Sequence, residues 1–275
     1  MSGQVLMGSK SEEKLSGPDL MEIAKDSVVR ISSKLGEYGG HGTAFAYKQV
    51  MTETGSTVYF LTNLHNFYMV LPLYNEVLRL ASQGHPDDDL LIKTSIIFRG
   101  KTYAVDKIVT CKGALFASDH KHFQDFAIFS VDSDISEELK MFALPEQSEA
   151  RPGEAVYAFG FPADTDLGIT EGIVSHVYRD HKNPDFCHQI QHSILINPGN
   201  SGGPTVNLNG AAVGMSTWGK QMSGSGRSLT GMNFSVNVAH TFEICRDNDL
   251  IEEVSMERIY QRFVARAREH FKYGS

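Results

Sequence analysis

The chain has 275 residues, of which 41% are hydrophobic and 21% are charged, so it can bury a core and does not have the composition of a coiled coil, a collagen or a disordered protein. Its formal net charge of −8 repels phosphate backbones and argues against a general nucleic-acid binder. No stretch approaches the roughly 18 apolar residues of a membrane span, so we expect neither a nucleic-acid nor a membrane partner.

The first residues, 1–17, are polar and rich in Ser and Gly, which predicts a flexible arm. They contain no apolar run behind a basic stretch, which argues against a secretory signal. We therefore expect the protein to be cytoplasmic or to be exported by a route that needs no signal peptide. The three scattered cysteines, Cys111, Cys187 and Cys245, favour reduced thiols over a disulfide framework.

Short strands dominate the first half, residues 18–131. Pro18 and Asp19 open a short helix that leads into a strand at 28–31. Apolar and β-branched runs predict five further strands, at 43–47, 58–62, 92–98, 103–110 and 126–131. Arg99-Gly100-Lys101 has the composition of a hairpin turn, and helical spacing over 68–80 predicts an inserted helix, followed by a loop at 84–89. This half therefore indicates a first β unit.

The second half repeats this β pattern after an acidic linker, residues 132–151. Strands are predicted within 152–246 at 155–160, 169–178, 188–194, 205–206, 211–217 and 233–238. Asn209-Gly210 supplies a tight hairpin turn. Asp249 followed by Glu252 is typical of a helix start, and apolar residues at helical spacing then predict one amphipathic helix over 247–275. This helix would cover the second core or bind a partner.

The sharpest chemical signal is the run Asn197-Pro198-Gly199-Asn200-Ser201-Gly202-Gly203-Pro204. A serine hydroxyl is a poor nucleophile unless a base removes its proton and fixed N–H groups receive the developing oxyanion. Glycines let the backbone turn sharply, expose Oγ and aim the N–H groups of Gly199 and Ser201 at one point. The alternative is a plain glycine-rich turn with a satisfied serine.

A base and an orienting carboxylate have candidates in the first half. His65 ends Leu61-Thr62-Asn63-Leu64-His65, just after a predicted strand, where a ring can face a cleft. Asp125 begins an apolar strand, where a carboxylate is costly to bury unless it is paired. The order His65, Asp125, Ser201 is the chain order of chymotrypsin-type triads.

Four segments extend this match, and through them the chain resembles the trypsin-like serine proteases of the HtrA/Deg type. They are Gly40-His41-Gly42-Thr43-Ala44-Phe45, Thr62-Asn63-Leu64-His65, Asp125-Phe126-Ala127 and residues 196–204. The resemblance covers about residues 23–238 and implies an all-β fold of two six-stranded antiparallel β-barrels with the site between them. It implies Ser201 as nucleophile, His65 as general base and acid, Asp125 as the residue that fixes the imidazole, and Gly199 with Ser201 as oxyanion hole.

The resemblance also places a substrate pocket. By position its lining is Leu195, Met215, Ser216, Thr217 and Met232, none of which is charged, so we expect small or medium aliphatic side chains before the scissile bond. The family commonly carries a PDZ module after the protease, but few residues follow 238 in this sequence, so we do not expect regulation through such a module. The segment between His65 and Asp125 looks longer than usual because of the predicted inserted helix.

These observations predict a serine endopeptidase that needs no cofactor or metal and that acts on protein or peptide substrates, with a homo-oligomer possible. One alternative is a catalytically latent binding or scaffold protein on the same fold, in which the oxyanion turn is collapsed. A second alternative is a metal site built from Cys187, His188 and His192. The direction of the Gly199 and Ser201 N–H groups distinguishes an active from a latent site.

Overall fold

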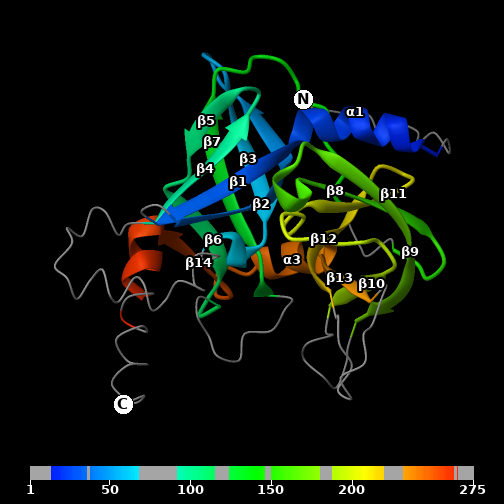
Figure 1. Ribbon diagram of the computed structural model, residues 1–275. Helices are drawn as coiled ribbons and strands as arrows, with labels where there is room; N and C mark the ends of the chain where they lie inside the picture. Colours follow the sequence, from blue (N-terminus) through cyan, green and yellow to red (C-terminus); the bar gives the residue numbers. More distant parts are fainter. Residues whose placement is uncertain are drawn as a thin grey trace, which may run out of the picture.

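The computed structural model describes residues 14–35, 38–67, 92–114, 124–145, 150–179, 188–219, 232–262 and 265. Two β units lie side by side in it, an open curled sheet and a closed barrel (Figure 1). The predicted all-β fold is thereby confirmed. The predicted insertion at 68–80 and 84–89 lies outside the described residues, as does the rest of the predicted arm before residue 14.

The first unit begins with a short helix and continues as an antiparallel sheet. Ser16 and Asp19 cap helix α1 (Gly17–Ser27) reciprocally, as Pro18 predicts for a helix start. The strands that follow are β1 (Val28–Leu35), β2 (Tyr38–Met51), β3 (Ser56–Thr62), β4 (Lys93–Phe98), β5 (Lys101–Ala104), β6 (Lys107–Cys111) and β7 (Ala127–Ser133). Arg99 and Gly100 both have positive φ in the β4–β5 turn, which agrees with the predicted hairpin.

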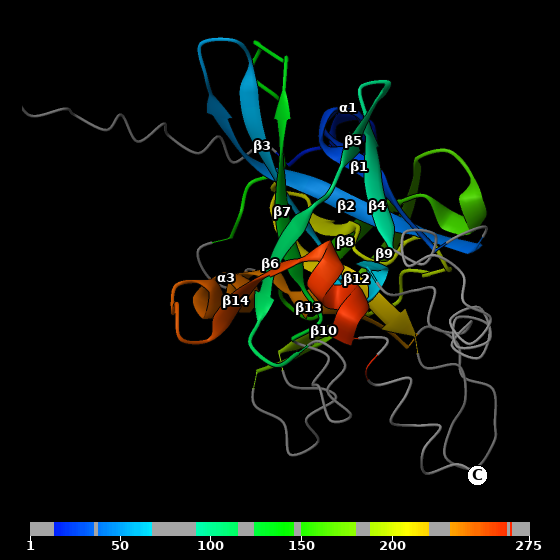
Figure 2. The same ribbon diagram turned by 90° about the vertical axis from the view of Figure 1, so that its left-hand side faces the viewer.

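The sheet of the first unit has eight strands rather than the six expected, in the order β14-β6-β7-β3-β2-β1-β4-β5. One extra strand arises because the stretch predicted at 103–110 forms two strands, β5 and β6. The other is β14 (Ile251–Ser255), which belongs to the segment predicted as helix. Figure 2 shows β14 beside β6, far along the chain from its partner.

The predicted helix over 247–275 is thus wrong at its beginning. Residues 251–255 pair with β6 from Ile251↔Cys111 to Ser255↔Lys107, and Val254 is buried. The apolar residues of this segment fit both helical spacing and strand alternation, and pairing with the free edge of β6 decides for the strand. A helix follows over 256–262, with the Ser255 hydroxyl accepting from the Arg258 N–H.

The second unit is a closed six-stranded barrel in the order β10-β13-β12-β11-β8-β9. Its strands are β8 (Ala155–Gly160), β9 (Gly168–Tyr178), β10 (Gln189–His192), β11 (Pro204–Asn207), β12 (Ala212–Gly219) and β13 (Asn233–Asn237). The short helix η5 (Pro162–Asp164) follows β8, and α3 (Val238–Cys245) follows β13. No helix in the described part of the chain is long and apolar enough to cross a membrane.

The two units share one hydrophobic core. Phe45 and Phe60 of the first sheet belong to the same buried cluster as Phe159, Met215 and Val236 of the barrel. Burial of this apolar surface fixes the units against each other, because separating them would expose it to water. Loops from both units can therefore combine at the junction into one rigid site.

The barrel also contains a buried chain of polar side chains. The His192 ring bonds through Nε2 to the Ser235 hydroxyl at 2.8 Å, and Ser235 bonds to the Thr205 hydroxyl at 2.7 Å. Thr205 in turn lies 3.3 Å from the Ser216 hydroxyl. Burial lowers the pKa of His192 to about 4, so its ring is neutral at physiological pH.

Candidate active site

His65 and Asp125 meet where two paired strands end. His65 lies in η1 (Leu64–Phe67), directly after β3, and Asp125 comes just before β7, which pairs with β3. The His65 Nδ1 is 2.7 Å from Asp125 Oδ2, and the His65 backbone N–H donates to Oδ1 at 2.9 Å. With Nδ1–H held by the carboxylate, Nε2 is left as the basic nitrogen of the ring.

Electrostatics at this pair favour a protonated imidazole. Burial by itself lowers the pKa of His65, but the charge of Asp125 and its hydrogen bond act the other way, and together they raise the pKa above the ordinary histidine value. About a quarter of the His65 side chain is exposed, whereas the Asp125 side chain is 4% exposed. The carboxylate is thus paired and shielded, and the ring keeps an open edge.

Ser201 is held by the first unit although it lies on a loop of the second. The backbone N–H of Thr43 donates to its carbonyl oxygen at 2.8 Å, and the Asn66 amide donates to the same oxygen at 2.9 Å. Gly202 follows with φ +88, and a Cβ there would lie 2.1 Å from the Thr43 oxygen. Only glycine fits this close approach, which explains why a glycine follows the serine.

The Ser201 hydroxyl donates to the Thr217 carbonyl oxygen at 3.3 Å. Thr217 is also tied to Asp125, because Asn63 Nδ2 donates both to the Thr217 hydroxyl, at 3.1 Å, and to the Asp125 carbonyl, at 2.9 Å. No hydrogen bond joins Ser201 to His65 within the described residues. In proteins without substrate such catalytic hydrogen bonds are often long or poorly aligned, and they tighten only when substrate binds.

The peptide before Gly199 has a fixed direction. The Pro198 carbonyl oxygen accepts from the Ala163 N–H at 2.8 Å, and because the trans peptide is planar the Gly199 N–H points the opposite way. The Asn200 carbonyl likewise accepts from the Gly203 N–H at 3.0 Å, which turns the Ser201 N–H away from it. Among the described residues neither N–H has an acceptor, so two oriented donors remain for a ligand oxygen.

The predicted pocket residues are not equally placed. Leu195 is 64% exposed and Met232 is partly exposed, so both can contact a substrate. Met215 is fully buried in the core between the units, and Ser216 is fully buried in the polar chain of the barrel. The side chains of these two residues are therefore not available to a substrate, because strand alternation turns neighbouring side chains of β12 to its two buried faces. Thr217 is mostly buried and contributes the carbonyl described above.

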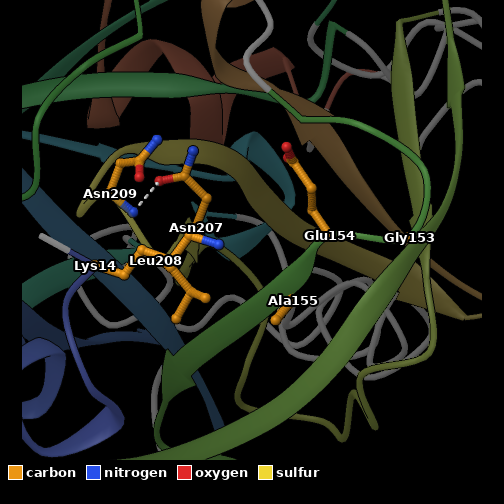
Figure 3. Close-up of a pocket in the computed structure, with 7 residues that line it drawn as sticks. All are labelled: Lys14, Gly153, Glu154, Ala155, Asn207, Leu208 and Asn209. Carbon is orange, nitrogen blue, oxygen red and sulfur yellow. Dashed lines mark hydrogen bonds between the residues drawn. The ribbon is translucent and has the colours of Figure 1, made fainter. Parts of the chain in front are cut away.

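Two other groups of residues were candidates for a binding site. A pocket of about 340 Å³ lies on the second unit, lined by Lys14, Gly153, Glu154, Ala155, Asn207, Leu208 and Asn209 (Figure 3). The Asn207 side-chain oxygen Oδ1 already accepts hydrogen bonds from the Asn209 and Ala211 N–H groups. Asn207 therefore stabilises the turn at this place, and its Oδ1 is not a free acceptor for a ligand. Of the alternative metal set, His188 stacks on His240 and Cys187 lies outside the described residues.

Sequence reasoning missed three residues that hold the site: Thr43, Asn66 and Ala163. Thr43 Oγ1 donates to the Gly199 carbonyl at 2.7 Å and accepts from the Phe161 N–H at 3.2 Å. Thr43 stands in a quoted motif, so its position beside a glycine was a usable signal. Asn66 acts through a contact across the unit junction, and Ala163 acts through a contact between two loops of the barrel; no local pattern records either contact.

The model of the trypsin-like peptidase domain matches residues 42–215, which is more than half of the chain. The chain belongs to the trypsin-like peptidase family. Among curated proteins, this peptidase-family chain is 36% identical over 124 residues to a probable periplasmic serine endoprotease DegP-like of Hahella chejuensis, and 34% identical over 137 residues to serine protease HTRA1A of Danio rerio. These alignments cover 45% and 48% of the chain, and 25% and 28% of the relatives. The chain thus matches about a quarter of the length of these relatives.

Solved structures agree on the fold. An HtrA-type protease AlgW with tripeptide superposes with a TM-score of 0.54 at 20% identity, covering 84% of this chain and 64% of that one. Deg5 superposes with a TM-score of 0.53 at 21% identity, covering 83% and 91%. The relatives also correct one expectation. Several are named periplasmic endoproteases, which contradicts a cytoplasmic location or signal-independent export. Composition of residues 1–17 was too weak a basis for that expectation.

Proposed function

We propose that the chain is a serine endopeptidase that hydrolyses peptide bonds in proteins or peptides through an acyl-enzyme. The observation that carries this proposal is the fixed direction of the Pro198–Gly199 peptide, together with the paired His65 and Asp125. A latent site would turn that carbonyl toward the incoming substrate oxygen, whereas here the Ala163 N–H holds it away. This direction supports the assignment of the Gly199 N–H as a donor to the oxyanion.

In the proposed reaction, His65 Nε2 takes the Ser201 hydroxyl proton as Oγ bonds to the scissile carbon. The carbonyl π electrons move to oxygen, which the N–H groups of Gly199 and Ser201 bind. The C–N bond then breaks and the leaving amine takes the proton from His65. A water molecule then attacks the acyl carbon while His65 takes its proton. The bond to Ser201 Oγ breaks, Oγ regains the proton from His65, and the acid product is released. Asp125 keeps the ring in the reactive tautomer and stabilises its cationic form.

Substrate preference before the scissile bond remains part of the proposal. Leu195 and Met232 are the exposed or partly exposed members of the predicted pocket, and both are apolar, which supports small or medium aliphatic side chains. A library of peptides varied at that position checks this, and selection of Lys or Arg contradicts it. Association of copies of the chain is a further expectation, which the molecular mass in solution tests.

The decisive experiment is intact-mass analysis after reaction with a fluorophosphonate. We expect one adduct on the wild-type protein, none on Ser201→Ala, and one on Ser175→Ala, which removes an exposed serine of β9 outside the site. A well-folded wild-type protein that forms no adduct contradicts the proposal and supports the alternative of a catalytically latent scaffold protein. In that case the hydrogen bond from the Ser201 hydroxyl to the Thr217 carbonyl would explain why the serine does not react.

A further inference from the structure

One outer face of the first sheet carries a histidine beside the Gly199 turn and two lysines beyond it. β2, β1 and β4 are neighbours in the sheet (Figure 2), and their registers place His41 opposite Ser32, and Lys34 opposite Lys93. Lys34 and Lys93 are exposed and His41 is partly exposed. We call His41, Lys34 and Lys93 the basic strip. Because side chains alternate between the two faces of a strand, all three lie on the side of the sheet that faces away from its core.

The strip starts at the oxyanion turn. His41 lies two residues before Thr43 on β2 and so shares its face, and Thr43 holds the Gly199 carbonyl. A Cβ built on Gly199 would lie 3.1 Å from His41 Nε2, so the imidazole is in contact distance of this backbone. A ligand bound to the Gly199 N–H must therefore pass close to His41.

The strip also contains an unfavourable pair. Lys34 and Lys93 are direct cross-strand partners, and like charges in that position destabilise a sheet. No carboxylate of the described residues pairs with either lysine, and the positions of β1, β2, β4 and β5 that face the same way carry no Asp or Glu. These two adjacent lysines stand on a chain of net charge −8. The arrangement is complementary to an anionic ligand.

The strip lies on the leaving-group side of the proposed reaction. The residue before the scissile bond contacts Leu195 of the second unit, whereas the leaving amine takes its proton from His65 of the first unit. From Gly199, β2 runs past His41 toward its own start, beside which Lys34 stands on β1. A peptide leaving the site along this strand meets His41 first and the two lysines next.

We infer that the basic strip binds acidic side chains located after the scissile bond and makes the enzyme selective for substrates with Asp or Glu there. This inference rests on the proposed function and adds a substrate class to it. An extended peptide spaces its side chains at about 3.3 Å per residue, so neighbouring acidic residues can reach successive members of the strip. Exposed ion pairs are individually weak, and selectivity comes from using several.

The first test compares kcat/KM for two peptides that differ only after the scissile bond, one with Glu and one with Gln at the first three positions. We expect a Glu-to-Gln ratio of about five at low salt, the size that two exposed ion pairs give, and a ratio near one in about 0.5 M salt. The double variant Lys34→Gln/Lys93→Gln should bring the ratio near one. Lys48→Gln, which removes a lysine of β2 that lies over the Tyr59 ring, should keep it. An unchanged ratio in the double variant overturns the inference.

A binding test separates this inference from the proposed function. Fluorescent Glu and Gln peptides are titrated against Ser201→Ala, and the Glu peptide should bind about five-fold more tightly, with the difference lost in the lysine double variant. Equal binding of the two peptides, or a preference only for a DNA oligonucleotide or anionic vesicles, overturns the inference. If the wild type takes no fluorophosphonate adduct, the proposed function fails while this titration still decides on the strip.

Discussion

The buried imidazole of His192 makes the stability of the barrel depend on acid. Its folded pKa of about 4 lies below the value of about 6.5 in an unfolded chain. Between these values the unfolded state binds the proton and the folded state does not. Stability is therefore complete above about pH 6.5 and falls as pH drops toward 4. At pH 5 the loss is about 2 kcal/mol, and near pH 4 it approaches about 3 kcal/mol.

Urea unfolding at pH 8, 6 and 5 measures this loss. Trp218, the chain's single tryptophan, stacks on Phe234 in the same barrel and reports its unfolding by fluorescence. His192→Gln should remove most of the loss, whereas His176→Gln, which changes an exposed ring of β9, should retain it. His65, whose pKa is raised, contributes an effect of opposite sign that is common to all three proteins. If wild type and His192→Gln lose stability equally between pH 8 and 5, the reasoning is refuted.

Three further predictions concern the site. Because the pKa of His65 is raised, kcat/KM should fall as pH drops through a value above the ordinary 6.5, and a flat profile from pH 5 to 8 would exclude this ring as base. Asn66→Ala removes the amide that donates to the Ser201 carbonyl oxygen, so it should lower kcat about 10-fold or more with little change in KM. Steady-state kinetics measures both constants, and a change in KM alone would argue against a positioning role. Gly202→Ala would place a Cβ 2.1 Å from a carbonyl oxygen of β2 and should lower the free energy of unfolding by more than about 3 kcal/mol, measured by thermal unfolding. Gly100→Ala, whose Cβ would meet no atom, should lower it by about 1 kcal/mol. Equal losses in the two variants would contradict the steric reason.

Much of the fold could be predicted because its signals are local. Strand alternation, the hairpin at Arg99-Gly100 and the capped start at Pro18 each depend on a few neighbouring residues, and the structure has them all. The segment 251–255 could not be assigned in this way. Its spacing satisfies helix and strand alike, and the edge of β6 that decides between them lies far away in the sequence.

The candidate site divides in the same way. The motifs around His65, Asp125 and Ser201 select the candidate residues, and the structure brings the first two into contact. Exposure of the pocket residues could not be predicted, because what packs against Met215, Ser216 and Leu195 comes from segments distant in the sequence. The hydrogen bond from Ala163 to Pro198, which orients the oxyanion turn, joins two loops whose approach depends on the closed barrel.

Strand β14 has a consequence for how the chain folds. Because residues 251–255 complete the edge of the first sheet, that sheet gains its last strand only after the whole second unit has been synthesised. Pairing between residues so distant in sequence is slow, since the loop must close before the contacts form. Until then the β6 edge is open to pairing with other chains. The first unit is therefore the part of a nascent chain most exposed to misassembly, and the second unit is expected to mature first.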